Sequence, residues 1–168
     1  MKIRHGFVTN SSSSSFIVVF PSDIQGSEEV KQLLFGDQEY ITSLYDCNEM
    51  ISTDRIASTI WQDILRHNVI SSIDELAAEI NEGWIENMPE LPRDTWMLDE
   101  NKYNEIINAW EYARTDFAYD IAKEFLSKVD DSSTIYLLSY ADGDGRYYGT
   151  LEHGNIFARV PHIRVNKH

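Results

Sequence analysis

The chain of 168 residues contains a single cysteine, Cys47. One thiol can form neither an internal disulfide nor a multi-cysteine zinc site, so we expect a reducing, cytoplasmic setting. No apolar run approaches the roughly 20 residues that a membrane-spanning helix needs. The first residues also lack the apolar core and cleavage site of a signal peptide. We therefore expect a cytoplasmic protein that has no membrane partner.

Basic residues are scarce as well. The chain has 14 Lys and Arg against 28 Asp and Glu, a formal net charge of -14. Binding to nucleic-acid phosphates requires a basic surface, so we expect no direct contact with nucleic acid. The charge is uneven, because the segment from Asp74 to Asp131 has sixteen acids and five bases, whereas residues 1–20 and 154–168 have no acid. An acidic middle thus lies between two basic ends.

Helices are predicted by apolar residues at three-to-four spacing and by capping residues. Ile56, Ile60 and Ile64 share one helix face, and Ser72 followed by Glu75 is a capping box. Asp99 can cap a long helix that keeps one apolar face through the residues up to 129. The predicted helices cover about residues 27–35, 53–67, 73–82 and 100–128.

Strands are predicted mainly near the two ends of the chain. Residues 16–20 form a continuous apolar run that ends at Pro21, as in a buried strand. Two Asp-Gly pairs at 142–145 predict a hairpin between strands 134–140 and 146–151. Weaker signals predict strands at 39–45, 156–160 and 162–165.

These elements predict an α+β fold, a single domain over residues 1–168. The N-terminal strand and the C-terminal meander would form a small, mostly antiparallel sheet. We expect the central helices, including the long helix of about residues 100–128, to pack on one face of that sheet.

Residues 4–18 read RHGFVTNSSSSSFIV, and this stretch resembles the opening of a loose group of small bacteriophage and bacterial proteins. The segments DGDG at 142–145, LEHGNIF at 151–157 and HIR at 162–164 also resemble that group. No activity is established for the group. The resemblance therefore implies a phage or mobile-element origin, with the host bacterial cytoplasm as the setting, and does not imply a function.

An anion site is one hypothesis for the two basic ends. If the terminal segments are neighbouring strands, a loop over residues 6–15 would place hydroxyl and N–H groups beside guanidinium groups. The alternative is that serines fill a loop and basic residues protect strand edges. No Gly-x-x-x-x-Gly-Lys pattern identifies a nucleotide loop. The candidate anion-binding residues are Arg4, His5, Ser11, Ser12, Ser13, Ser14, Ser15, Arg159, His162 and Arg164.

A metal or catalytic site is a weaker hypothesis, built from Asp142, Asp144, Glu152 and His153. The segment begins like a calcium loop, but Arg146 and His153 stand where ligands are required, and a hairpin turn explains the acids more simply. We therefore expect no metal and no cofactor. Glu152 and His153 could act as a base with Asp142, but no Gly-x-Ser-x-Gly motif marks a nucleophile, so catalytic residues stay unassigned.

The acidic middle suggests a contact surface for a partner protein. Carboxylates along a helix can imitate DNA phosphates and occupy a basic cleft, for example on a nucleic-acid-binding host protein. The alternative is an ordinary solvated helix face. We expect a phage-type accessory protein that binds a host protein and is not an enzyme; the second hypothesis is a ligand-binding or catalytic site between residues 10–15 and 142–168. The candidate contact residues are Glu105, Glu111, Asp116, Asp120 and Glu124.

Overall fold

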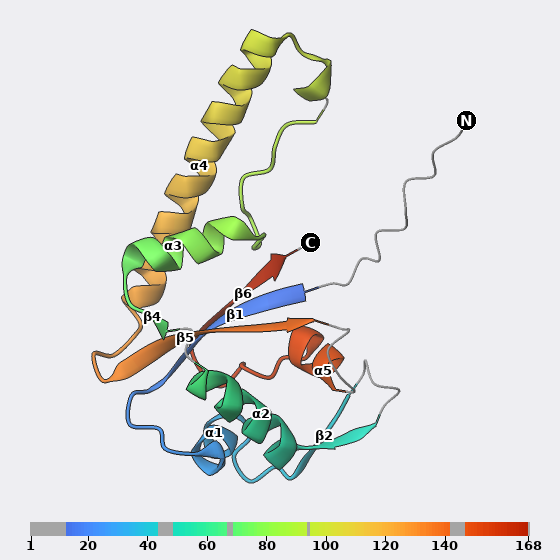
Figure 1. Ribbon diagram of the computed structural model, residues 1–168, viewed down its shortest axis with the longest axis vertical. Coiled ribbons are helices and arrows are strands. Elements are labelled where there is room, and N and C mark those ends of the chain that lie inside the picture. The colour runs from blue at the N-terminus through green and yellow to red at the C-terminus, as the bar shows by residue number, and fades with distance from the viewer. Residues whose placement is uncertain (1–12, 44–48, 67–68, 94, 142–146, 168) are drawn as a thin grey trace.

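A four-stranded antiparallel sheet in the order β4-β5-β1-β6 lies at the centre of the protein (Figure 1). The computed structural model describes residues 13–43, 49–66, 69–93, 95–141 and 147–167. The strands are β1 (Ser13–Pro21), β4 (Val69–Ile70), β5 (Ser133–Ala141) and β6 (His162–Lys167). The central strand β1 pairs with β5 along its whole length and with β6 from Ser13 to Val18. The sheet therefore joins the two ends of the chain, as expected.

Strand β1 is buried on both of its faces, which explains its continuous apolar run. Phe16 and Val18 contribute to a core on one side of the sheet, and Ile17 and Val19 to a second core on the other side. A strand that is apolar on both faces needs cover on both faces. The α+β class is confirmed, but the expectation that the helices pack on one face is wrong.

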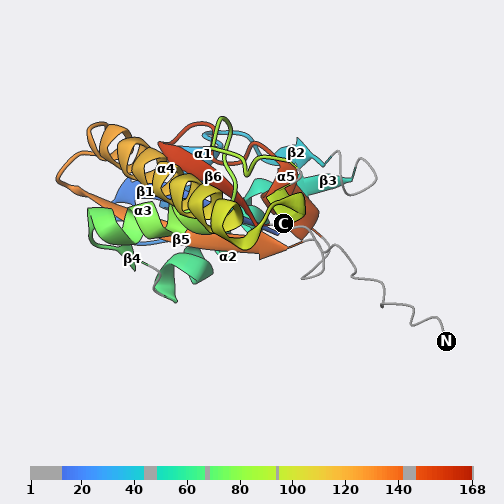
Figure 2. The same ribbon diagram turned by 90° about the horizontal axis from the view of Figure 1, so that it is seen from above.

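Two groups of helices cover the sheet. Helices α1 (Ser27–Leu34), α2 (Thr53–Leu65) and α5 (Tyr148–His153) pack on one face, and α3 (Ile73–Glu82) and α4 (Glu100–Leu126) on the other. Figure 2 shows α3 and α4 lying over the strands when the molecule is seen from above. Ser72 accepts a hydrogen bond from the Glu75 N–H at the start of α3, as the capping box predicts.

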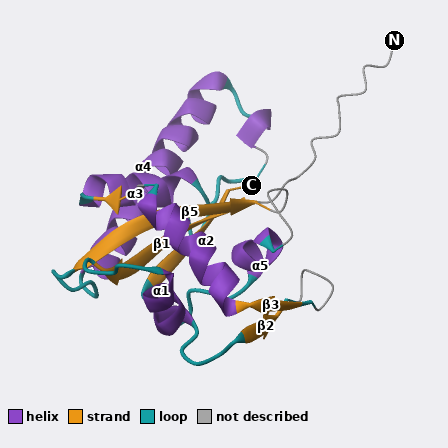
Figure 3. Cartoon of the chain, turned by 60° about the horizontal axis from the view of Figure 1, so that its bottom comes forward, coloured by secondary structure: helices purple, strands orange, loops and turns teal. Residues whose placement is uncertain are grey.

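A small hairpin of β2 (Tyr40–Thr42) and β3 (Met50–Ser52) follows α1, and Figure 3 shows it beside α5. Gly36 ends α1 with φ of 62°, a left-handed conformation that a helix C-terminus commonly requires of glycine. Among the described helices, none has the length and apolar character needed to cross a membrane.

The first half of α4 extends beyond the sheet, and the segment before it runs back alongside (Figure 1). The fully buried residues of α4 are Ala118, Ala122 and Phe125, all in its second half. The Trp110 indole N–H donates to the Pro89 carbonyl at 3.0 Å and so ties the returning segment to the helix. We call residues 84–116, apart from residue 94, the arm. The predicted apolar face is thus buried against the sheet only beyond the arm.

The C-terminal part of the chain differs from the predicted meander. Residues 148–153 form helix α5 instead of a strand, and residues 156–160 form turns before β6. Thr150, Leu151 and Glu152 are all buried, a run that the alternating faces of a half-buried strand do not allow. Residues 142–146, the predicted hairpin turn, lie outside the described residues.

Candidate functional site

The serines that the structure describes lie in strand β1 and not in a loop. Ser14 and Ser15 are each only 1% exposed. Ser15 Oγ lies 2.9 Å from the hydroxyl of Ser139 on β5, and Ser13 Oγ donates to the Lys167 carbonyl at 3.0 Å. These hydroxyls connect β1 to its two neighbours, β5 and β6. The candidates Arg4, His5, Ser11 and Ser12 lie outside the described residues.

Ser14 and Arg164 meet on the face of the sheet that α5 covers, as the anion hypothesis requires. The Ser14 hydroxyl accepts hydrogen bonds from Arg164 Nε at 3.2 Å and Nη2 at 3.1 Å, and it donates to Asn166 Oδ1 at 3.3 Å. The Arg164 guanidinium also lies 5.8 Å from the centre of the Phe16 ring. The Ser14 hydroxyl is therefore buried and hydrogen-bonded within the sheet, which does not suit a nucleophile.

Helix α5 connects Arg164 to a buried carboxylate. Arg164 Nη2 lies 3.3 Å from His153 Nδ1, and His153 Nε2 lies 3.6 Å from Glu152 Oε1. Because the guanidinium can only donate, Nδ1 must accept, which places the imidazole proton on Nε2, facing Glu152. The Glu152 side chain is 0% exposed, and neither oxygen is hydrogen-bonded to a described residue. Glu152, His153, Arg164 and Ser14 form what we call the buried network, in which His153 lies between Arg164 and Glu152.

The other two described basic candidates for the anion site, His162 and Arg159, do not belong to the buried network. His162 Nδ1 is 3.1 Å from the Val160 carbonyl, and its ring centre is 6.3 Å from that of Phe157. Arg159 is exposed, and its guanidinium lies close to Gly36, at the end of α1. The predicted anion residues therefore divide between the buried network and a separate position beside α1.

A pocket of about 520 Å³ is lined by residues from the end of α1, from β2 and the segments next to it, and from α5 and the segment that follows it. Its wall includes His153 of the buried network and Arg159. Ser43 and Thr150 hydrogen-bond to each other there through their hydroxyls, and both are buried. The described residues that line it are Leu34, Phe35, Gln38, Ile41, Thr42, Ser43, Thr150, His153, Gly154, Asn155, Ile156 and Arg159.

The predicted contact residues are all exposed on α4, but they do not share one face. At about 100° per residue, Glu105, Asp116, Asp120 and Glu124 fall within about 100° of one another, whereas Glu111 lies about 120° away from Glu105. Asp120 is paired with Lys123 on the same helix at 3.4 Å, and Glu124 with Lys128, just after the end of α4, at 2.6 Å. The hydrogen bond from Lys128, reinforced by its charge, lowers the pKa of Glu124.

Glu105 and Asp116 have no ion-pair partner among the described residues, and Tyr112 shares their helix face. We call Glu105, Tyr112 and Asp116 the outer stripe. Tyr112 is 75% exposed, and Met97 at the far end of the arm is 65% exposed. Further exposed apolar side chains of the arm are Trp84, Leu91, Leu98 and Tyr103.

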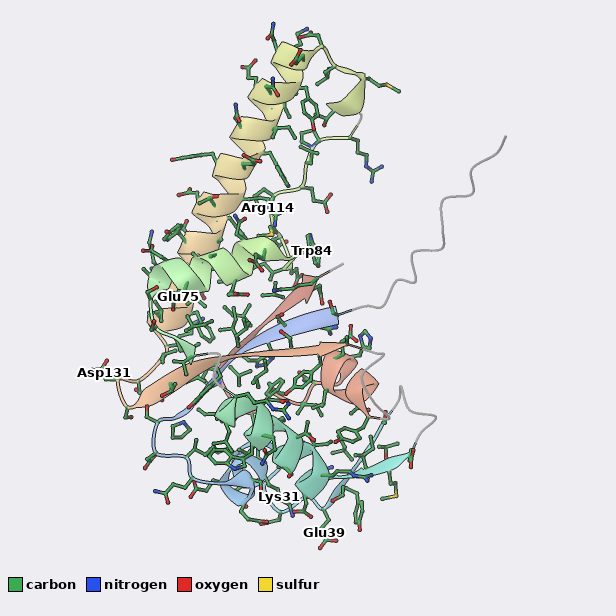
Figure 4. The ribbon with its side chains drawn as sticks, viewed as in Figure 1. Lys31, Glu39, Glu75, Trp84, Arg114 and Asp131 are labelled. Carbon is green, nitrogen blue, oxygen red and sulfur yellow. The ribbon has the colours of Figure 1, made fainter. Side chains whose placement is uncertain are left out.

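Arg114 attaches the arm to the body of the protein (Figure 4). Its Nη2 donates to the carbonyls of Asn81 at 2.6 Å and Gly83 at 2.8 Å, at the end of α3. The guanidinium also lies 4.9 Å from the centre of the Trp110 ring. This arginine thus binds carbonyls within the chain, and the carboxylates of the outer stripe lie on the opposite side of α4.

In the part of the chain that the structure describes, no group of side chains supports the metal hypothesis. No cluster of three or more His, Cys, Asp or Glu residues is arranged there to hold an ion. Asp142 and Asp144 lie outside the described residues, and Glu152 and His153 belong to the buried network.

Sequence reasoning missed the pocket and the exposed Tyr112 between Glu105 and Asp116. Phe35, Thr150 and Asn155 line the pocket from segments that carry no chemical motif, so only the fold brings them together. Tyr112 could have been found from its spacing of seven and four residues from Glu105 and Asp116. No protein-family model matches the chain, and no curated protein or solved structure matches it.

Proposed function

We propose that the protein acts by binding a partner protein through the outer stripe of the arm. In the phage-type setting that the N-terminal resemblance implies, this partner is a host protein. The observation that carries the proposal is the projection of the first half of α4 beyond the sheet, with Tyr112 and two unpaired carboxylates exposed. The sheet and its two cores are complete without that half of the helix.

The chemistry of the outer stripe matches a basic partner surface. Tyrosine and methionine side chains are enriched in protein interfaces. Tyrosine buries a large area with few rotatable bonds, and methionine adapts to the shape of its surroundings. Glu105 and Asp116 carry charges that no described lysine or arginine pairs with. A partner that offers lysine or arginine beside an apolar groove would satisfy both kinds of side chain.

The density of charge favours a local basic patch over a long DNA-binding groove. Glu105, Asp116, Asp120 and Glu124 extend over about 28 Å of helix, at about 1.5 Å per residue. That is one carboxylate per roughly 7–9 Å, whereas duplex DNA has one phosphate per about 1.7 Å of its axis. Two of the four carboxylates are also paired with lysines. A partner with a local basic patch is therefore favoured over a partner whose DNA-binding groove would be filled by imitation of DNA.

Photo-crosslinking tests the proposal at a single residue. A photoreactive phenylalanine at position 112 should crosslink to one host protein in a lysate, and the same group at Tyr40 should not. Tyr40 is a matched control because it is 50% exposed and lies on β2, on the far side of the sheet from α4. Equal crosslinking from both positions would contradict a specific contact at the arm.

Charge reversal then tests the chemistry of the contact. Glu105→Lys with Asp116→Lys should weaken binding of the crosslinked protein by about tenfold or more, and added salt should weaken binding to the unaltered chain. Asp23→Lys with Asp37→Lys changes the net charge equally at exposed sites outside the arm and should leave binding within about twofold. Equal effects of the two double variants would refute the stripe as the contact. Competition by duplex DNA would identify the partner as a DNA-binding protein.

A further inference from the structure

The pocket between α1, β2 and α5 differs in charge from the rest of the protein. The chain has twice as many acidic as basic residues, yet none of the described residues that line this pocket is Asp or Glu. Its lining carries one guanidinium, from Arg159, and the imidazole of His153. A pocket with this composition in an acidic protein favours an anionic ligand.

Arg159 is the residue that can provide the charge. Among the described residues no carboxylate pairs with its guanidinium, whereas Arg164 faces the buried Glu152 through His153. Gly36 allows the guanidinium to lie against the end of α1, because a Cβ there would come within 2.8 Å of Nη1. The guanidinium therefore lies beside the turn that ends α1.

The remaining lining divides into a polar part and an apolar wall. The polar part consists of the hydroxyls of Ser43 and Thr150, which hydrogen-bond to each other, and the amide of Asn155. Leu34, Phe35, Ile41 and Ile156 supply apolar surface. A volume of about 520 Å³ lies within the range of pockets that hold small organic ligands, so inorganic phosphate alone would leave most of the pocket unfilled.

We propose that this pocket binds a small organic oxyanion, a phosphate or carboxylate carried on an apolar ring, with the anionic group at Arg159 and the ring against Phe35. This site is separate from the proposed partner surface, because the pocket and the arm lie on opposite faces of the sheet. The buried network forms part of the wall through His153 and holds α5 in place against β6.

Titration calorimetry with four probes tests the two parts of the ligand separately. Phenyl phosphate has both parts, inorganic phosphate only the anion, phenol only the ring, and benzoate replaces phosphate by carboxylate. We expect phenyl phosphate or benzoate to bind the full chain at least tenfold more tightly than inorganic phosphate or phenol. Each of the first two probes makes both the ionic and the apolar contact, whereas the other two make only one of them. The tighter of the two identifies the preferred oxyanion. Absence of binding by both, or equal binding by inorganic phosphate, would overturn the proposal.

Variants assign the binding to the pocket. Arg159→Met should weaken binding of the tighter probe by about tenfold or more, since it removes a charged hydrogen-bond donor to the anionic group. Asn155→Asp places a carboxylate at the exposed edge of the pocket and should also weaken binding. Arg93→Met removes an equally exposed arginine from the arm and should change nothing. A loss of binding in Arg93→Met, or none in Arg159→Met, would refute the site.

Discussion

Replacement of Arg164 by methionine should destabilise the protein because it leaves Glu152 without a compensating charge. The Glu152 carboxylate is fully buried, and its connection to a positive charge runs through His153 to Arg164. Methionine keeps the apolar length of the arginine stem beside Phe16 while removing the guanidinium. The substitution therefore tests the charge and not the packing.

The expected loss in the free energy of unfolding follows from the contacts that Arg164 makes. Removing one member of a buried ion pair typically costs about 3–5 kcal/mol. Arg164 is only half-buried and reaches Glu152 through an imidazole, so we expect the lower end, about 3 kcal/mol. For a chain of this length that corresponds to a fall in melting temperature of roughly 6–12 °C.

A double-mutant cycle separates the charge pair from the hydrogen bonds to Ser14. Glu152→Gln removes the charge that Arg164 balances, so the double variant should lose about 1–2 kcal/mol less than the sum of the single variants. Urea unfolding followed by tryptophan fluorescence gives the three free energies. Arg159→Met serves as the control and should change stability by less than about 0.5 kcal/mol, because Arg159 is exposed. Additive effects of Arg164→Met and Glu152→Gln would refute the buried network.

Two further predictions concern Asp63 and Gly154. Burial raises the pKa of Asp63, only partly offset by the charge of Arg66, so the folded protein disfavours its ionised form. Ionisation of this acid therefore destabilises the folded protein as the pH rises above its ordinary pKa of 3.8. Asp63→Asn should raise the melting temperature more at about pH 7 than at about pH 4. An equal change at both pH values would contradict the burial effect. Gly154→Ala would place a Cβ 2.2 Å from the Thr150 carbonyl oxygen, so urea unfolding should show a loss of about 1–3 kcal/mol. Gly26→Ala has no atom within 4 Å of its Cβ and should be nearly neutral by comparison; similar losses would exclude the steric explanation.

The elements that sequence reasoning predicted well are those whose signals are local. The capping serine of α3 and the capping aspartate of α4 bond to backbone N–H groups three residues ahead, so each signal lies within one turn of the chain. The apolar run of β1 was likewise visible, and its continuity already implied cover on both faces. The expectation of helices on one face does not agree with this continuity.

Helix α5 could not be predicted because its stability is not local. It has only six residues, and isolated helices of that length are unstable in water. Burial of Leu151 and Thr150 stabilises it in the folded protein. The Asp-Gly pairs before it gave a stronger local signal for a hairpin, and the tertiary contacts decided otherwise.

The projection of the arm beyond the sheet could not be predicted from the sequence, for a geometric reason. The apolar spacing of α4 continues along the helix, but a helix of 27 residues is about 40 Å long, whereas strands of nine residues span about 30 Å. One end of such a helix must extend beyond the sheet unless another element covers it. Spacing alone shows which face is apolar and does not show what covers that face.

The two proposed surfaces are physically separate, which makes their tests independent. The outer stripe belongs to the layer of α3 and α4, and the pocket to the layer of α1, α2 and α5, with the sheet between them. Substitutions that share no contacts usually have additive effects. Failure of the crosslink at Tyr112 would therefore leave the pocket proposal intact, and failure of phenyl phosphate and benzoate to bind would leave the arm intact. An effect of Arg159→Met on partner binding would require the sheet to transmit a change between its faces, and its rigid, doubly buried strand β1 argues against that.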